Sequence, residues 1–175
     1  MSIKQFNGTY HPREDRLEVR FNTPRDEEFK LWLTRRMTLS LMHFCEQFAL
    51  QALSTKHSPT VAKDLDEFEQ YALKQRADFA TAYQPSTNLP LGESAVLVTG
   101  ITLKPVDSDA DGKVNLSFQL ENNINLGMTI SRGMLNAIRL LLDDLVNAAQ
   151  WKTNTPAAMD ADLAKETSTA GPTLH

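Results

Sequence analysis

Two stretches of this chain, 97 residues apart, carry the same pattern of apolar and polar residues, and this match constrains the fold more than any other feature. In each stretch, two short segments alternate at period two, which is typical of β-strands with one buried face. A gapless shift of 97 positions places the apolar residues Leu17, Val19, Phe21, Phe29, Leu31 and Leu33 on Val114, Leu116, Phe118, Leu126, Met128 and Ile130. The sequence therefore predicts two similar antiparallel hairpins.

A helix is expected after each hairpin, because Thr34 and Ser131, also 97 apart, can serve as N-caps. In the first helix, at about residues 35–54, we expect a buried stripe of Met37, Leu41, Phe44, Phe48 and Ala52, widened by Met42, Cys45 and Ala49. Further strands are expected at 3–10 and 95–106. The predicted fold class is α+β, with a duplicated βββα unit; two unrelated amphipathic units that happen to match are the alternative.

A third helix is expected between the two units. Ser58 and Pro59 form an N-cap followed by Pro at the first helical position. Apolar residues then form a narrow stripe, which we expect to pack on the core along one side: Val61, Leu65, Phe68, Ala72, Phe79 and Tyr83. We expect one domain over residues 1–151, made of a first unit (1–57), an inserted helix (58–83), a linker (84–94) and a second unit (95–151), followed by a flexible tail (152–175).

Composition favours a cytoplasmic protein. The chain has 41% hydrophobic residues, a net charge of −4 and a single cysteine, Cys45, so no internal disulfide can form. No signal-like segment or run of about 20 apolar residues is present, and we expect no membrane contact. We expect the chain to fold alone or as a homo-oligomer.

One acidic run has the spacing of metal ligands. Asp107, Asp109 and Asp111 alternate before Gly112, as in the first half of a calcium loop, and Asn115 could supply a further oxygen. The twelfth position, where a helix-loop-helix calcium site has a bidentate Glu, is Phe118. A solvated acidic turn without metal is the favoured interpretation. We expect no cofactor.

The chain shows no catalytic motif. It has no paired CxxC, no H-x-x-x-H, no G-x-S-x-G and no glycine-rich phosphate loop. His43 and Cys45 are two apart on a predicted helix and so point about 200° apart. An enzyme would need an active site assembled from distant residues, such as a deep pocket that holds buried carboxylates or His43.

The outward face of the first hairpin combines an aromatic residue with cations. Opposite the apolar face lie Glu18, Arg20, Lys30 and Trp32, and Arg35 and Arg36 follow directly. Trp32 could stack an unpaired base while Arg20, Lys30, Arg35 and Arg36 meet phosphates. Alternatively, Trp32 packs under the inserted helix or in a subunit interface. Arg35 and Arg36 could instead pair with acids of the hairpin, which are Asp26, Glu27 and Glu28.

The segment from Glu28 to Arg36 reads E-F-K-L-W-L-T-R-R. It resembles a segment shared by uncharacterised proteobacterial proteins with an E-F-x-L-W-L-T-R-R signature, and the resemblance covers about residues 12–45. It implies a bacterial cytosolic protein and carries over no functional residues. The arrangement of repeated sheet and helix is also similar in architecture to the Whirly and PC4-like single-strand binders.

The sequence as a whole favours a non-enzymatic binding or assembly module that acts through protein–protein contacts and forms a homodimer through sheet edges or helices. A single-stranded DNA or RNA binder that uses Arg20, Lys30, Trp32, Arg35 and Arg36 is the alternative. An enzyme with a dispersed active site is the third possibility.

Overall fold

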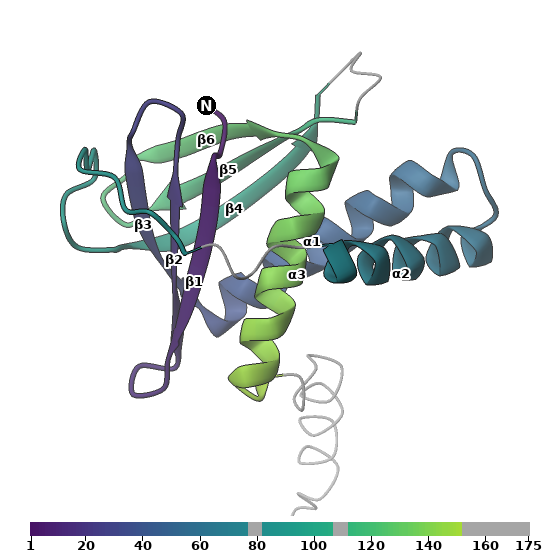
Figure 1. The fold of residues 1–175 in the computed structure, drawn as a ribbon, viewed down its shortest axis with the longest axis horizontal. Helices are drawn as coiled ribbons and strands as arrows, with labels where there is room; N and C mark the ends of the chain where they lie inside the picture. The colour runs from purple at the N-terminus through teal and green to yellow at the C-terminus, as the bar shows by residue number, and fades with distance from the viewer. Residues whose placement is uncertain (77–81, 107–111, 152–175) are drawn as a thin grey trace, which may run out of the picture.

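The computed structural model describes residues 1–76, 82–106 and 112–151. It shows an α+β fold, as predicted, with six strands and three helices (Figure 1). In chain order the elements are β1 (Gln5–His11), β2 (Arg16–Asn22), β3 (Glu28–Thr34), α1 (Arg35–Ser54), α2 (Pro59–Arg76), β4 (Val96–Pro105), β5 (Val114–Leu120), β6 (Asn125–Ile130) and α3 (Arg132–Ala148).

The six strands form one mixed sheet in the order in which they occur in the chain. All neighbours are antiparallel except β3 and β4, which run parallel and pair at Leu31 with Val96 and at Trp32 with Leu97. The outermost strands are β1 and β6, and the backbone N–H of Thr129 in β6 donates to the carbonyl oxygen of Met1 (3.0 Å). The two edges of the sheet therefore approach each other at one end, where Figure 1 shows the N-terminus beside β6.

The two predicted hairpins are present, and their registers correspond. Leu17 pairs with Leu33 in the first, as Val114 pairs with Ile130 in the second, and both pairs are buried. The remaining inward pairs follow the same offset of 97: Val19–Leu31 and Phe21–Phe29 match Leu116–Met128 and Phe118–Leu126. Both hairpins thus turn their apolar residues to one face, as the period-two pattern predicts.

Both predicted N-caps are confirmed. The hydroxyl of Thr34 accepts a hydrogen bond from the backbone N–H of Met37 (3.3 Å), and the hydroxyl of Ser131 accepts one from Met134 (3.2 Å). Each cap satisfies one of the N–H groups that lack a partner in the first turn of a helix. As a result, α1 and α3 begin at equivalent positions directly after β3 and β6.

The buried face of α1 differs from the predicted stripe. Its most buried residues are Thr38, Leu41, Cys45, Ala49 and Leu53. Phe44, predicted to be core, is 39% exposed, and Met37 and Phe48 are only partly buried. In α3 the corresponding buried residues are Leu135, Ile138, Leu142 and Val146, each 97 positions after one in α1.

Helices α1 and α3 each pack on a strand from the opposite half of the sheet. α1 packs against β4, and α3 packs against β1. Gly8 in β1 permits the second contact, because a Cβ atom at this position would lie 2.6 Å from Cδ1 of Leu145. Each helix therefore packs on the first strand of the opposite half, on the same side of the sheet (Figure 1).

The inserted helix α2 differs from its prediction in two respects. Tyr83, predicted to belong to it, lies in a segment without regular structure; α2 is described to Arg76, and Phe79 lies outside the described residues. It also packs on α1 and α3 with only part of its predicted apolar stripe, since Leu65 and Ala72 are partly buried whereas Val61 and Phe68 are exposed. Figure 1 shows α1 and α2 projecting beyond the sheet as a helical hairpin.

Trp151 binds the C-terminal end of α3 to β1 and to the turn between β1 and β2. The indole N–H of Trp151 donates to Oδ1 of Asp15 (2.6 Å), which also accepts from the hydroxyl of Tyr10 (3.1 Å). The ring of Trp151 lies edge-on to that of Tyr10, with centroids 5.6 Å apart. Residues 152–175, predicted to be a tail, lie outside the described residues.

Candidate interaction surfaces

The structure brings together three of the five residues predicted to form a binding surface. Arg20 pairs with Lys30 across β2 and β3, and Trp32 pairs with Glu18, so these side chains share the outer face of the first hairpin. Trp32 is partly buried by neighbours in its own sheet. The ring of His11 meets the indole edge-on with centroids 4.8 Å apart, and the Arg16 guanidinium lies 5.3 Å from the centre of the indole.

The cations of this face are engaged by the segment that leads into β4. The ammonium of Lys30 donates to the carbonyl oxygen of Glu93 (3.2 Å), and the Arg20 guanidinium lies 5.2 Å from the centre of the Tyr83 ring. Burial and the nearby Glu28 carboxylate raise the pKa of Tyr83. Glu28 is itself buried and accepts from the backbone N–H of Ser86 (2.8 Å). Trp32 and its neighbours thus form a partly covered surface.

Arg35 and Arg36 do not join that surface. Arg35 donates to the carbonyl oxygen of Trp151 (3.2 Å), at the C-terminal end of α3. The predicted pairing of Arg35 with hairpin acids is wrong, because Glu27 accepts instead from Thr23 (2.9 Å) and Glu28 is buried against Ser86. Arg36 is exposed at the start of α1.

The predicted metal site cannot be placed as a unit. Asp107, Asp109 and Asp111 lie outside the described residues. Asn115 is on β5, where its Oδ1 accepts from the hydroxyl of Thr129 (2.8 Å). Within residues 1–76, 82–106 and 112–151, no group of three or more His, Cys, Asp or Glu residues could hold a metal ion.

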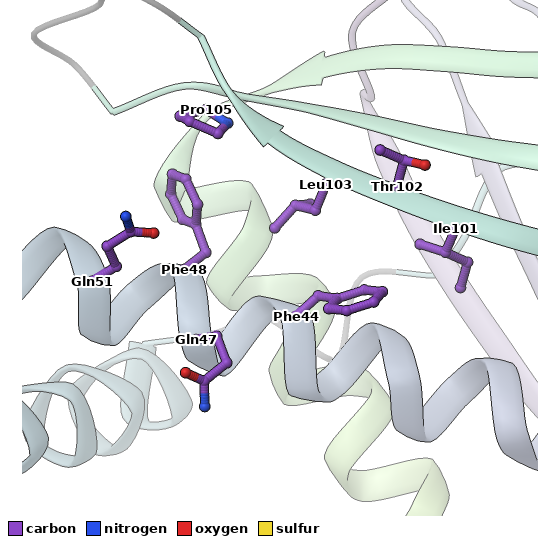
Figure 2. Close-up of a pocket in the computed structure, with 8 residues that line it drawn as sticks. All are labelled: Phe44, Gln47, Phe48, Gln51, Ile101, Thr102, Leu103 and Pro105. Atoms are coloured by element: carbon purple, nitrogen blue, oxygen red, sulfur yellow. The ribbon is translucent and has the colours of Figure 1, made fainter.

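A hollow of about 290 Å³ lies between α1 and β4. Figure 2 shows Phe44 and Phe48 extending from α1 toward the strand, and the hollow is lined by Phe44, Gln47, Phe48, Gln51, Ile101, Thr102, Leu103 and Pro105. None of these eight side chains is titratable, and His43 is not among them. The acid–base groups that a dispersed active site requires are therefore not in this hollow.

The contact between α3 and β1 corresponds to the contact between α1 and β4 that contains the hollow, but there the helix and the strand pack closely. Phe48 and Leu145 are 97 positions apart, and Leu145 fits tightly on Gly8 in β1. Phe48 and Leu103 of β4 both line the hollow, and Leu103 corresponds to Gly8 because it pairs with Leu116 as Gly8 pairs with Val19. The strand beside the hollow thus has a leucine where the strand under α3 has a glycine.

The most unusual surface lies on α2. Three large apolar side chains face solvent there: Val61 (44% exposed), Phe68 (67%) and Tyr71 (65%). Their positions, seven and three residues apart, lie within about a quarter-turn of one another on the helix. We call Val61, Phe68 and Tyr71 the α2 stripe.

Polar contacts to α3 hold α2 on the side opposite the stripe and on one flank of it. The Asp66 carboxylate is buried and accepts two hydrogen bonds from Nη1 of Arg139, at 2.7 and 3.0 Å. Arg132 of α3 donates to Glu69 (2.7 Å), and Lys74 donates to Asp144 (3.0 Å). Three ion pairs to α3 thus orient α2 so that the α2 stripe points away from the core.

Sequence analysis named Val61 and Phe68 as core residues and did not identify Tyr71. One sequence feature indicates the docked side of α2. Ala62, Asp66 and Glu69 form a row of one small and two acidic residues, and this row faces Arg132 and Arg139. Periodicity alone assigns the apolar side of a helix to the core. It does not detect a helix that is held by its charged side.

Comparison with known proteins gives no match: no protein-family model, no curated protein and no solved structure matches this chain. Within the part of the chain that the structure describes, no helix is both long and apolar enough to cross a membrane. The resemblance of the segment Glu28–Arg36 to proteobacterial proteins stays a prediction.

Proposed function

We propose that this protein is a non-enzymatic assembly module of the bacterial cytosol, and that the α2 stripe is its main protein–protein contact. The observation that carries the proposal is the exposure of Phe68 and Tyr71, at 67% and 65%, on a helix held to the core by ion pairs. Exposed apolar area has a free-energy cost of about 25 cal/mol per Å² relative to a buried state, so a partner that covers these rings gains binding energy. Clustered aromatic side chains are typical of contact surfaces.

The sheet with α1 and α3 supports this role, because it forms a rigid base for α2. We interpret the halves β1–β3–α1 and β4–β6–α3 as a duplicated βββα unit, because their hairpin registers, N-caps and buried helix positions all correspond at an offset of 97. Each helix packs on the strand of the other half, so neither half is complete alone. The projecting α2 is then the element left for contacts with other molecules.

Site-specific photo-crosslinking in cells tests the proposal. A photoreactive phenylalanine analogue in place of Tyr71 is expected to give a discrete covalent adduct. The same analogue at Gln119, an exposed position on β5, is the matched control and is expected to give none. A second substitution, Phe68→Ser, should abolish the adduct at position 71 because it removes the largest apolar side chain of the stripe.

The proposal fails if position 71 gives no discrete adduct, or if the same adducts form at positions 71 and 119. It also fails if Phe68→Ser leaves the adduct unchanged, because the label would then report chance proximity and not the α2 stripe.

A second candidate function is single-stranded nucleic-acid binding by the outer face of β2 and β3. The observation in its favour is a pair of cation–aromatic stacks there, Arg16 on Trp32 and Arg20 on Tyr83, beside Lys30. Bases stack on aromatic rings and phosphates bind such cations. This surface is less open than the α2 stripe, since His11 and Arg16 cover part of the Trp32 ring.

Fluorescence titration with short single-stranded DNA and RNA tests this second function. Trp151 is 2% exposed, so quenching by a ligand would report Trp32. Binding predicts quenching that weakens with added salt and disappears in Trp32→Ala. Absence of quenching at low salt would reject it.

A further inference from the structure

We infer that the partner of the α2 stripe is α2 of a second copy of this chain, in antiparallel orientation. This inference rests on the proposed function and names its partner. It follows from three features of α2: the spacing of its aromatic residues, the order of its exposed charges and its position at the rim of the molecule.

The aromatic spacing suits a self-complementary contact. Phe68 and Tyr71 are three residues apart on one side of α2 and lie near the middle of its 18 residues. If two α2 helices pair antiparallel about a two-fold axis between these residues, Phe68 of one copy lies opposite Tyr71 of the other, twice. Each ring then buries its exposed face against an aromatic ring, an arrangement that aromatic pairs favour.

The exposed charges favour the same orientation. Glu67 and Lys74 are seven residues apart, hence on one flank of the stripe, and their side chains are 69% and 53% exposed. The antiparallel pair brings Glu67 of each copy next to Lys74 of the other. In a parallel pair about a two-fold axis, the flanks that carry Glu67 and Lys74 lie on opposite sides of the interface, so Glu67 of one copy would not meet Lys74 of the other.

The present partners of these charges do not prevent the contact. Lys74 donates to Asp144 (3.0 Å), but an ammonium has three donors and can bind Glu67 of the second copy as well. Among the residues that the structure describes, Glu67 forms an ion pair with Lys63 alone, at 4.0 Å, and both side chains are about 70% exposed. Such a surface pair contributes little, so Glu67 is free to exchange it for a better partner.

The size and place of α2 define the expected strength of the dimer. An 18-residue helix is about 27 Å long, and one helix pair of this length buries less than the roughly 1,600 Å² of a standard interface. Because the α1–α2 hairpin projects beyond the sheet (Figure 1), a second copy can approach it without moving the core. We therefore expect a reversible dimer with a micromolar dissociation constant.

Sedimentation equilibrium of the full chain over a range of concentrations, with charge-reversal variants, tests the inference. The parent should shift from monomer to dimer mass. Glu67→Lys and Lys74→Glu should each weaken the dimer by about tenfold or more, because each places two like-charge pairs in the interface. The double variant Glu67→Lys/Lys74→Glu should dimerise more tightly than either single variant, and less tightly than the parent because it loses the ion pair between position 74 and Asp144.

A mixing experiment keeps the test informative if the double variant folds poorly. Equimolar Glu67→Lys and Lys74→Glu proteins should form a heterodimer at concentrations at which each alone is monomeric, since every cross-pair is then of opposite charge. Circular dichroism of each variant confirms that the monomers are folded.

Three outcomes overturn the inference, and they separate it from the proposed function. A parent that is monomeric at all concentrations, while Tyr71 still crosslinks in cells to a protein of another mass, refutes the second copy and leaves the assembly module standing. A dimer that is insensitive to both single variants refutes the antiparallel α2 contact. Monomer with no adduct at position 71 refutes both proposals.

Discussion

At the scale of single residues, Gly8 is the described glycine at which packing leaves the least room for a side chain. A Cβ atom would lie 2.6 Å from Cδ1 of Leu145, which is closer than side-chain atoms approach. We predict that Gly8→Val lowers the free energy of unfolding by about 2 kcal/mol, because the helix or the leucine has to move. Urea unfolding followed by circular dichroism measures this.

Two comparisons test the cause of that loss. In Gly8→Val/Leu145→Ala, the combined effect should fall short of the sum of the single effects by about 1 kcal/mol, because the clash is removed. Gly127→Val is the control, since a Cβ there meets only Ser117 at 3.6 Å, an ordinary contact. Equal stability of Gly8→Val and the parent would contradict the tight contact between α3 and β1.

Cys45 gives a prediction about pH. Burial raises the pKa of its thiol from 9.0 to about 12. Below pH 9 the thiol is protonated in both the folded and the unfolded state, so its contribution to stability is complete. Between pH 9 and pH 12 the unfolded state loses the proton first, and stability falls as pH rises.

The measurement compares unfolding free energies of the parent and Cys45→Ala at several pH values. The difference between them should decrease by about 1.4 kcal/mol per pH unit above pH 9. A constant difference up to pH 11 would show that Cys45 is not enclosed by the core.

The sequence predicts the inward residues of the strands correctly, but it predicts the buried face of α1 only in part. Thr38 is buried because its hydroxyl donates to the carbonyl oxygen of Thr34 (3.1 Å), a local bond that satisfies a polar group in the core. Phe44 faces the hollow beside β4 and stays partly exposed. The burial of Thr38 and the exposure of Phe44 do not follow from the hydrophobicity of these residues, because each depends on contacts that form only in the folded protein.

At the scale of elements, the attachment of α2 depends on the pair Asp66–Arg139. We predict that Asp66→Asn costs about 3 kcal/mol, because it leaves the largely buried Arg139 guanidinium without its counter-ion. Lys63→Gln is the control, since the Lys63–Glu67 pair is exposed and its loss should change stability by less than about 0.5 kcal/mol. Similar losses in the two variants would contradict a docking contact at Asp66.

The existence of α2 could be predicted, and its orientation could not. Pro59 and the apolar stripe indicate a helix correctly. Which side docks depends on Arg132 and Arg139, about 70 residues away in the sequence, and a pattern within α2 contains no information about them. Buried ion pairs of this kind can set the orientation of a helix even when they add little net stability.

At the scale of the whole molecule, the sequence predicts the strands of each half and the turn between β2 and β3. It does not predict the parallel contact between β3 and β4, because alternation identifies which face of a strand is buried and not which strand lies beside it. The crossed packing of α1 on β4 and α3 on β1 is likewise invisible in the periodicity. The offset of 97 residues nevertheless predicts correctly which positions of the two hairpins and of the two helices that follow them correspond.

The orientation of α2 is the central claim, and thiol labelling of single-cysteine variants tests it most directly. In a Cys45→Ala background, Phe68→Cys and Ala62→Cys place a thiol on two sides of α2 that are about 120° apart; Ala62 is 0% exposed and Phe68 is 67% exposed. In dilute protein, the thiol at position 68 should react nearly as fast as in the unfolded chain, and the thiol at position 62 should react orders of magnitude more slowly. Fast labelling at position 62 with protection at position 68 would mean that the apolar side of α2 faces the core, and would contradict the account.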